Sequence, residues 1–226
     1  YLLILGLFSF FINFYYLKFG TFPIDTFLHY DSAQRILKNE LPIRDYWVVS
    51  GLVVDFIQSI FFKFFGINWL AYSLHASLFN SLMAYIVYFF FLEIKISNFK
   101  AFVFSISFAT LSYTISGTPF VDLHATFFLL IATLLIMNNL NTQKNYLWSI
   151  ITFLIFLSFL SKQVPATYAI FGYILILLYY FCFLQKKEYK KIVIIFFTAL
   201  LLIISLIILL KFNKISLKSF YIQYLD

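Results

Sequence analysis

Long apolar runs without an alternating pattern dominate the chain, and short polar stretches separate them. A segment needs about 20 mainly apolar residues to cross the hydrocarbon core of a bilayer. On this criterion we expect about seven membrane-spanning helices, at Tyr1–Leu17, Trp69–Leu92, Phe99–Ile115, Leu123–Met137, Tyr146–Leu160, Ala166–Leu184 and Ile192–Leu210. Strands of a membrane barrel alternate in polarity, so the continuous runs predict an all-α polytopic bundle.

Two shorter helices are predicted in the long loop that follows the first span. Gly51–Phe65 is too short to cross a membrane, and its Asp55, Gln58 and Lys63 can share one helix face. We expect this amphipathic helix to lie in the membrane interface. Another short helix is expected at Asp31–Lys38. No internal repeat or low-complexity linker is visible, so the spans and interfacial helices form a single transmembrane domain over residues 1–226.

Composition agrees with a membrane protein. Of the 226 residues, 63% are hydrophobic and 11% are charged, whereas soluble domains carry about 25% charged residues. The chain begins inside an apolar run without an initiator Met and ends just beyond another run. We therefore interpret it as the N-terminal part of a longer membrane domain, truncated at both ends. The single Cys182 excludes a disulfide framework.

The distribution of lysines predicts the orientation in the membrane. Basic residues occur in the loops 93–100, 138–145 and 185–191, whereas 116–122 contains none. The positive-inside rule then places the first three loops in the cytoplasm, and 116–122, 20–49 and 161–165 outside. If the seventh span exits outward, three following lysines break this pattern: Lys211, Lys214 and Lys218. Because the net charge of +7 lies largely in such loops, it does not indicate nucleic-acid binding.

Candidate functional side chains gather in the loops that are predicted to lie outside. The first loop holds four of the nine acids and both arginines of the chain: Asp25, Asp31, Glu40, Asp45, Arg35 and Arg44. The second brings Asp122 and His124 to the mouth of the next span, and the third adds Lys162 and Gln163. Loops on a rigid scaffold commonly carry sites, so this convergence on one face is the strongest functional signal in the sequence.

These residue types suit transfer of a sugar from a lipid phosphate. A carboxylate can accept a proton from an acceptor hydroxyl, while Arg and Lys can hold the phosphate oxygens of a leaving group. Structural interpretations stand beside this one: Asp25 or Asp31 caps a helix, the arginines bind lipid headgroups, and Lys162 extends to the interface. His75, inside the second span, is interpreted as a packed polar residue and left out of the site.

Other chemistries have no support in the sequence. It contains no zinc-type spacing, no glycine-rich phosphate loop and no Ser/His/Asp nucleophile motif. No metal ligands and no definite cofactor are predicted, although the outer-loop acids would allow a divalent cation.

The stretch from Asp25 to Trp47 carries a family resemblance. It reads Asp-Thr-Phe-Leu-His-Tyr-Asp-Ser-Ala-Gln-Arg-Ile-Leu-Lys-Asn-Glu-Leu-Pro-Ile-Arg-Asp-Tyr-Trp. It resembles the first outer loop of GT-C fold glycosyltransferases, in the bacterial group related to protein O-mannosyltransferases and aminoarabinose transferases. In that group an aspartate precedes an Ala-x-x-Ile/Leu-Leu-x-Gly-x-x-Pro-Tyr-x-Asp stretch, and here Asn39 replaces the Gly and Ile43 the Tyr. The segments from Gly51 and from Asp122 resemble the family's juxtamembrane helix and second acidic site.

The resemblance implies an inverting transferase on the outer face of the bacterial cytoplasmic membrane. It would move a sugar from a polyprenyl-phosphate donor to a lipid, glycan or protein acceptor, in contact with membrane lipids. Asp25 would be the general base, with Asp31 as its rival, and Asp122 would orient the acceptor or donor. Binding of substrate and donor phosphate is expected at His29, Arg44, Asp45, His124, Lys162 and Gln163.

Two other classes of protein are open. A transporter or flippase for a lipid-linked sugar or another amphiphile would also be polytopic and basic. Transporters tend to place ionisable residues and broken helices near the bilayer midplane, whereas this chain keeps nearly all its charge in loops. A purely structural membrane scaffold predicts no clustering of acids and bases on one face.

Overall fold

A computed structural model of the chain describes residues 1–19, 23–48, 50–112, 117–142, 144–184 and 189–225. The structure is 83% helical, and these ranges contain no strand. In chain order the longer helices are α1 (Leu2–Tyr16), α2 (Pro23–Leu37), α3 (Leu52–Phe65), α4 (Trp69–Glu93), α5 (Asn98–Leu111), α6 (Val121–Thr142), α7 (Asn145–Ser161), α8 (Gln163–Tyr179) and α9 (Tyr189–Phe212). The short helices are η2 (Tyr180–Leu184), α10 (Leu217–Phe220) and η3 (Tyr221–Leu225).

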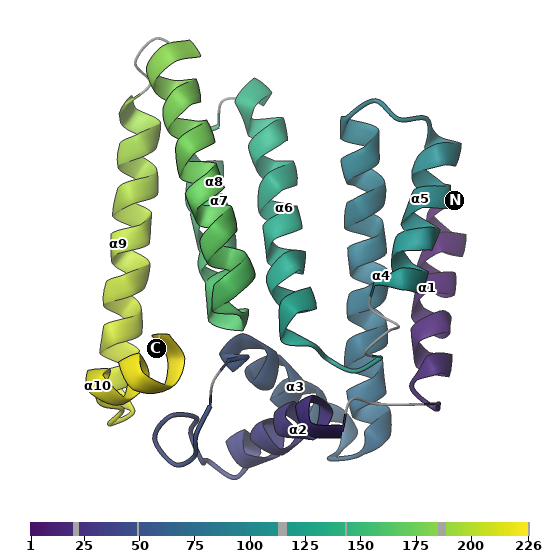
Figure 1. The fold of residues 1–226 in the computed structure, drawn as a ribbon, viewed down its shortest axis with the longest axis vertical. Helices are drawn as coiled ribbons and strands as arrows, with labels where there is room; N and C mark the ends of the chain where they lie inside the picture. Colours follow the sequence, from purple (N-terminus) through teal and green to yellow (C-terminus); the bar gives the residue numbers. More distant parts are fainter. Residues whose placement is uncertain (20–22, 49, 113–116, 143, 185–188, 226) are drawn as a thin grey trace.

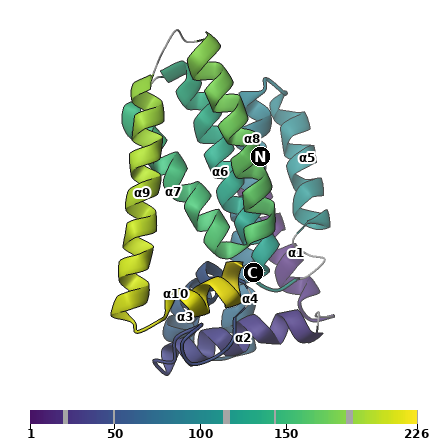
Figure 2. The ribbon, with the colours of Figure 1, turned by 60° about the vertical axis from the view of Figure 1, so that its left-hand side comes forward.

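Four of the described helices are long and apolar enough to cross a membrane. They are α4, α6, α9, and α8 together with the first residues of η2. The apolar helices α1, α5 and α7 are shorter, with 10–17 residues each. All of these helices run side by side along one axis of the molecule (Figures 1 and 2). The described residues thus form an all-α bundle in which four helices are long and apolar enough to cross a membrane, while the number of seven spans stays a prediction.

The long helices form two groups. Helices α1, α4 and α5 pack on one another, α6 packs on α7 and α8, and α7 also packs on α9. Contacts of α4 with α6 join the groups, and α3 packs against α4 and α7. Helices α2 and α3 lie at one end of the bundle, where α10 and η3 also lie (Figure 1). We call this the α2–α3 end, and the end with the α4–α5 turn the opposite end.

Helix α3 turns Asp55 and Gln58 toward the bundle. Both are fully buried, whereas Phe56, Ile60 and Phe64 are exposed. Lys63, which was predicted on the same face, is exposed instead. The helix was predicted as interfacial because of its polar and apolar faces, and the structure gives the direction of each face. An interfacial helix in this orientation places its aromatic and aliphatic side chains toward lipid and keeps its polar groups inside the protein.

Several helix boundaries differ from the predicted ones. Helix α2 begins at Pro23 instead of Asp31, because a proline is well suited to the first position of a helix. Asp31 is therefore inside a helix and does not cap it. The predicted loop 161–165 shrinks to Lys162 alone, which is the cap of both α7 and α8. The predicted end of a span at Ile115 lies outside the described residues.

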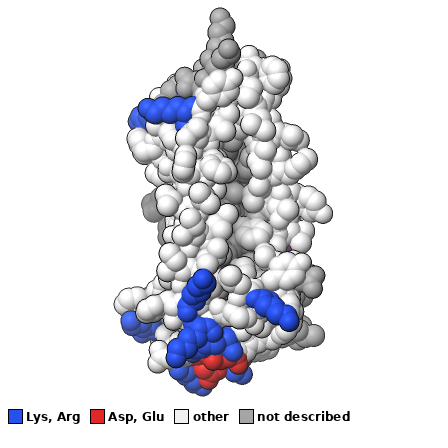
Figure 3. Space-filling model, turned by 90° about the vertical axis from the view of Figure 1, so that its left-hand side faces the viewer, with Lys and Arg blue, Asp and Glu red and all other residues white. Residues whose placement is uncertain are grey.

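Charged side chains lie near the two ends of the molecule, and the band between them on the face that carries α9 has none (Figure 3). Helix α9 ends at the α2–α3 end, where Arg44 Nη1 donates a hydrogen bond to Asn213 O at 3.4 Å. Gln223 of η3 also bonds to this loop, donating to Ile43 O and accepting from Val48 N, at 3.2 Å each. The lysines that follow the last span therefore do share the end predicted to lie outside.

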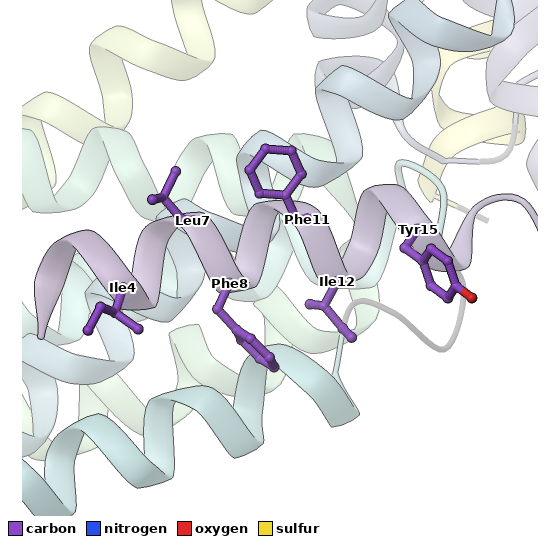
Figure 4. A pocket seen from close by; sticks show the side chains of 6 residues that line it. All are labelled: Ile4, Leu7, Phe8, Phe11, Ile12 and Tyr15. Carbon is purple, nitrogen blue, oxygen red and sulfur yellow. The ribbon is translucent and has the colours of Figure 1, made fainter.

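An apolar groove follows α1. It is lined by six side chains of this helix (Figure 4): Ile4, Leu7, Phe8, Phe11, Ile12 and Tyr15. Most of these side chains are exposed. In a membrane such a surface is covered by lipid chains.

Candidate functional site

Four helices meet at Gly51, the residue before α3. Its backbone N–H donates to Ser161 O at the end of α7, at 3.0 Å. Its φ of +87° lies in the left-handed region, which favours glycine. A Cβ at this position would lie 2.5 Å from His29 Cε1 of α2 and 2.8 Å from Val121 Cγ1 of α6. Glycine is therefore required both by the backbone and by the close approach of its neighbours.

Two predicted site residues lie directly beside this junction. Asp122 follows Val121, and Lys162 follows Ser161. Lys162 Nζ is 3.7 Å from Asp122 Oδ2, and the two side chains are 30% and 42% exposed. The structure thus joins the predicted second and third outer loops in one ion pair that solvent and ligands can reach.

The start of α2 lies beside the loop that leads into α6. Thr26 Oγ1 and Thr118 Oγ1 are 3.2 Å apart, and Tyr72 OH of α4 donates to Thr26 O at 2.8 Å. Asp25 precedes Thr26, so its backbone lies at the same end as Asp122. The Asp25 side chain lies outside the described residues.

A buried polar cluster joins α2 to α3. Asp55 Oδ1 accepts a hydrogen bond from His29 Nδ1 at 2.7 Å, and Asp55 Oδ2 accepts one from Ser32 Oγ at 2.6 Å. Asp55 is fully buried and His29 is 3% exposed. Burial raises the pKa of the Asp55 carboxyl, although attraction to His29 and the two hydrogen bonds oppose this. His29 is among the site residues predicted from the sequence, whereas Asp55 was predicted only as part of an amphipathic helix face.

Ser32 is in turn fixed by Tyr46. The two hydroxyl oxygens are 2.8 Å apart, and Tyr46 OH also approaches Ser32 O at 3.2 Å. Burial raises the pKa of Tyr46 to about 12, so its phenol stays protonated at neutral pH. Tyr46 therefore anchors the loop after α2 onto the buried cluster.

A second buried chain of polar groups joins α3, α4 and α6. His75 Nδ1 lies 2.7 Å from Gln58 Oε1, and His75 Nε2 lies 2.9 Å from His124 Nε2. His124 Nδ1 donates to Phe120 O at 2.8 Å. The interpretation of His75 as a packed polar residue agrees with this arrangement. His124 was predicted at the mouth of a span, and the structure buries it fully. Asp55 and Gln58 were not predicted as site residues, although the sequence shows them as polar residues three positions apart in an apolar segment.

Five further charged residues of the predicted first outer loop form ion pairs on the surface. Arg35 bonds to Asp31 at 2.6 Å and to Glu40 at 3.0 Å. Arg44 pairs with Asp45 at 2.7 Å, and this guanidinium holds the pKa of the Asp45 carboxyl below its usual range. These groups face water at the α2–α3 end and are separate from the buried cluster around Asp55.

Gln163 is occupied by the C-terminal segment. Its Nε2 donates to Tyr224 O of η3, and Tyr224 OH donates to Phe159 O of α7 at 3.1 Å. Within the described part of the chain, no group of three or more His, Cys, Asp or Glu side chains has the geometry to hold a metal ion.

Comparisons with known proteins add no relative. No protein-family model, no curated protein and no solved structure matches this chain.

Proposed function

We propose that this chain belongs to a membrane glycosyltransferase that transfers a sugar from a polyprenyl-phosphate donor to an acceptor. In this proposal all seven apolar helices cross the bacterial cytoplasmic membrane, and the α2–α3 end faces outward. The observation that carries the proposal is the meeting of α2, α3, α6 and α7 at Gly51, with the Asp122–Lys162 ion pair beside it. Three loops that are distant in sequence thereby supply a carboxylate, a cation and a histidine to one region.

The chemistry of this region fits the transfer of a sugar from a phosphate. The Lys162 ammonium can hold a phosphate oxygen of the donor while Asp122 orients the acceptor or donor. A base on α2 then accepts the acceptor's proton. Asp25 is the candidate from sequence, and its rival Asp31 is less suitable because it is 59% exposed and already paired with Arg35.

The conformation of Asn39 also supports the resemblance in the first outer loop. Asn39 has a φ of +65°, which is a left-handed conformation that glycine adopts most easily and asparagine next. It stands where the glycosyltransferases in question have glycine. A turn of the same backbone shape would explain both residues.

A transfer assay on the intact gene product in membranes tests this proposal. Membranes are supplied with a panel of radiolabelled polyprenyl-phosphate sugars, and product is identified by mass spectrometry. We expect Asp122→Asn and Lys162→Gln each to lower transfer about 100-fold, because each removes a group that acts on the reacting atoms. Glu93→Gln and Lys100→Gln, which make the same chemical changes at the opposite end, should keep wild-type rates.

A transporter of a lipid-linked sugar is the second candidate, and the buried His75–His124 pair is the observation that favours it. Ionisable residues inside a bundle often mark a transport path. However, His75 is only the seventh residue of α4, about 9 Å along the helix from its start. This position is close to the α2–α3 end. Labelled lipid that changes leaflet in a protein-dependent way without being consumed would establish the transporter instead.

A further inference from the structure

We propose that Asp55 is a positioning residue for His29: it holds the imidazole with Nδ1–H toward its carboxylate, so that His29 Nε2 accepts the acceptor's proton. This inference rests on the proposed transferase function. It assigns the proton to a histidine, whereas the sequence predicts an aspartate.

The hydrogen bonds around Asp55 fix the direction of the pair. An ionised carboxylate can only accept, so His29 Nδ1 donates across the 2.7 Å contact while Asp55 is charged. The other carboxylate oxygen accepts from Ser32, which Tyr46 holds in place. Both oxygens are thereby satisfied although Asp55 is fully buried. A neutral imidazole with its proton on Nδ1 carries its lone pair on Nε2.

His29 differs in this respect from the other two histidines. Both ring nitrogens of His75 are engaged by Gln58 and His124, and both ring nitrogens of His124 are engaged by His75 and the Phe120 carbonyl. In the described part of the chain, the His29 side chain makes one hydrogen bond, which is the bond to Asp55. Within the described residues, His29 is thus the histidine whose second ring nitrogen has no hydrogen bond, and the proposal assigns this nitrogen to the acceptor.

The place of His29 in the fold suits this role. Its Cε1 edge lies against Gly51, whose missing side chain leaves room for the ring. Gly51 is bonded to Ser161, the neighbour of Lys162, and lies beside Val121, the neighbour of Asp122. His29 therefore shares Gly51 as a neighbour with Val121 and Ser161, the residues that precede Asp122 and Lys162 in the chain.

The proposed reaction moves one proton to His29 and one sugar to the acceptor. The acceptor O–H bond breaks and its proton moves to His29 Nε2. The acceptor oxygen forms a bond to the anomeric carbon of the sugar, and the bond from that carbon to the phosphate oxygen breaks. The electron pair of that bond leaves with the polyprenyl phosphate near Lys162. The imidazolium formed on His29 is stabilised by the Asp55 carboxylate.

The tautomer of His29 tests the positioning without an assay of activity. ¹⁵N-histidine spectra of the full-length protein in nanodiscs are recorded, with His29→Gln to assign the His29 signals. We expect an Nδ1–H tautomer in the wild type and a mixture of tautomers in Asp55→Asn. An Nε2–H tautomer in the wild type would overturn the proposal.

Transfer kinetics with the same panel of radiolabelled donors test the role in catalysis. Asp55→Asn and His29→Gln should each lower kcat about 100-fold with little change in KM, and Asp55→Glu should recover part of the loss. Ser32→Ala, which removes one hydrogen bond to Asp55 but no charge, should give a smaller loss in the same direction. This variant keeps the test decisive if Asp55→Asn does not fold.

The two proposals fail in different ways. If the wild type is active and Asp55→Asn and His29→Gln are as fast, the role of His29 is wrong while the transferase stands. The same holds if Asp25→Asn alone abolishes transfer. If the wild type transfers no sugar from any donor of the panel, both the transferase proposal and the proton transfer to His29 are wrong.

Discussion

Helices α4 and α9 have nearly the same length but opposite surroundings. In α4 the mean hydropathy of the most apolar window is 1.4 and 56% of the window is buried, whereas in α9 the values are 3.4 and 0%. The less apolar helix is thus the more buried one. Lipid chains are as apolar as leucine, so polar side chains in a membrane are placed inside the protein.

The buried polar groups of α4 hold its neighbours. Asn80 Nδ2 donates to Ser9 O of α1 at 2.7 Å and to Ala109 O of α5 at 3.1 Å. Ser81 Oγ donates to Gly6 O of α1 at 2.7 Å. Directional bonds between helices therefore select the packing of α4, whereas α9 presents a face that any lipid chain can cover.

Replacement of His75 by leucine should have the largest effect. The change removes the hydrogen-bond partner of the buried Gln58 side chain, and we expect the free energy of unfolding to fall by about 3 kcal/mol. Ser205→Leu makes a polar-to-apolar change on the exposed face of α9 and should change it by less than about 0.5 kcal/mol. Unfolding by SDS in mixed micelles measures both. Equal effects in the two helices would contradict the comparison.

The pH dependence of stability should report the inward face of α3. Burial raises the pKa of the Asp55 carboxyl in the folded state, so the folded protein binds this proton more tightly than the unfolded chain does. Asp55 therefore contributes stability that is present below the ordinary Asp pKa and is lost as pH rises through its raised pKa.

This decline is isolated by comparing the wild type with Asp55→Asn. We expect the difference in unfolding free energy between them to shift in favour of the variant as pH rises from about 4 to 8. The hydrogen bonds from His29 and Ser32 offset part of the burial, so the effect should be smaller than that of His75→Leu. A pH-independent difference would show that Asp55 is not buried as a titrating group.

Two Gly→Ala substitutions should give the smallest effects, and they make the same chemical change at a packed and at an open position. A Cβ at Gly6 of α1 would lie 1.8 Å from the Tyr85 hydroxyl of α4, whereas a Cβ at Gly172 of α8 would meet no atom within 4 Å. Gly6→Ala should lower the unfolding free energy by about 1 kcal/mol, because Tyr85 must move. Gly172→Ala should raise it by about 0.5 kcal/mol, because alanine favours the helix. Thermal unfolding of both variants in one detergent decides between these signs.

Much of the fold could be predicted because the length and hydropathy of each apolar run indicate a long helix without reference to the rest of the chain. The runs at Trp69–Leu92 and Ile192–Leu210 match α4 and α9 to within three residues at each end. Helix α3 was predicted as a separate short helix from its length and its polar and apolar positions. The length of α2 was underestimated, although Ile24, Phe27 and Leu28 in its first turns have the i, i+3, i+4 spacing of a helix.

The candidate site was predicted in part. Convergence of the outer loops correctly indicated that Asp122 and Lys162 lie together. The partnership of His29 with Asp55 was not predicted, because these residues are 26 positions apart and belong to separate helices. The pairing of His75 with His124, 49 positions apart, was missed for the same reason.

The sequence alone indicates a bundle of apolar helices of the kind found in membranes, because the length and hydropathy of a segment are local properties. It also determined which segments carry charge. The packing of the helices is what shows that α3 turns Asp55 and Gln58 inward, that four helices meet at Gly51, and that Asp122 and Lys162 form an ion pair. These features depend on contacts between residues distant in the chain, and the periodicity of a single helix carries no information about its partners.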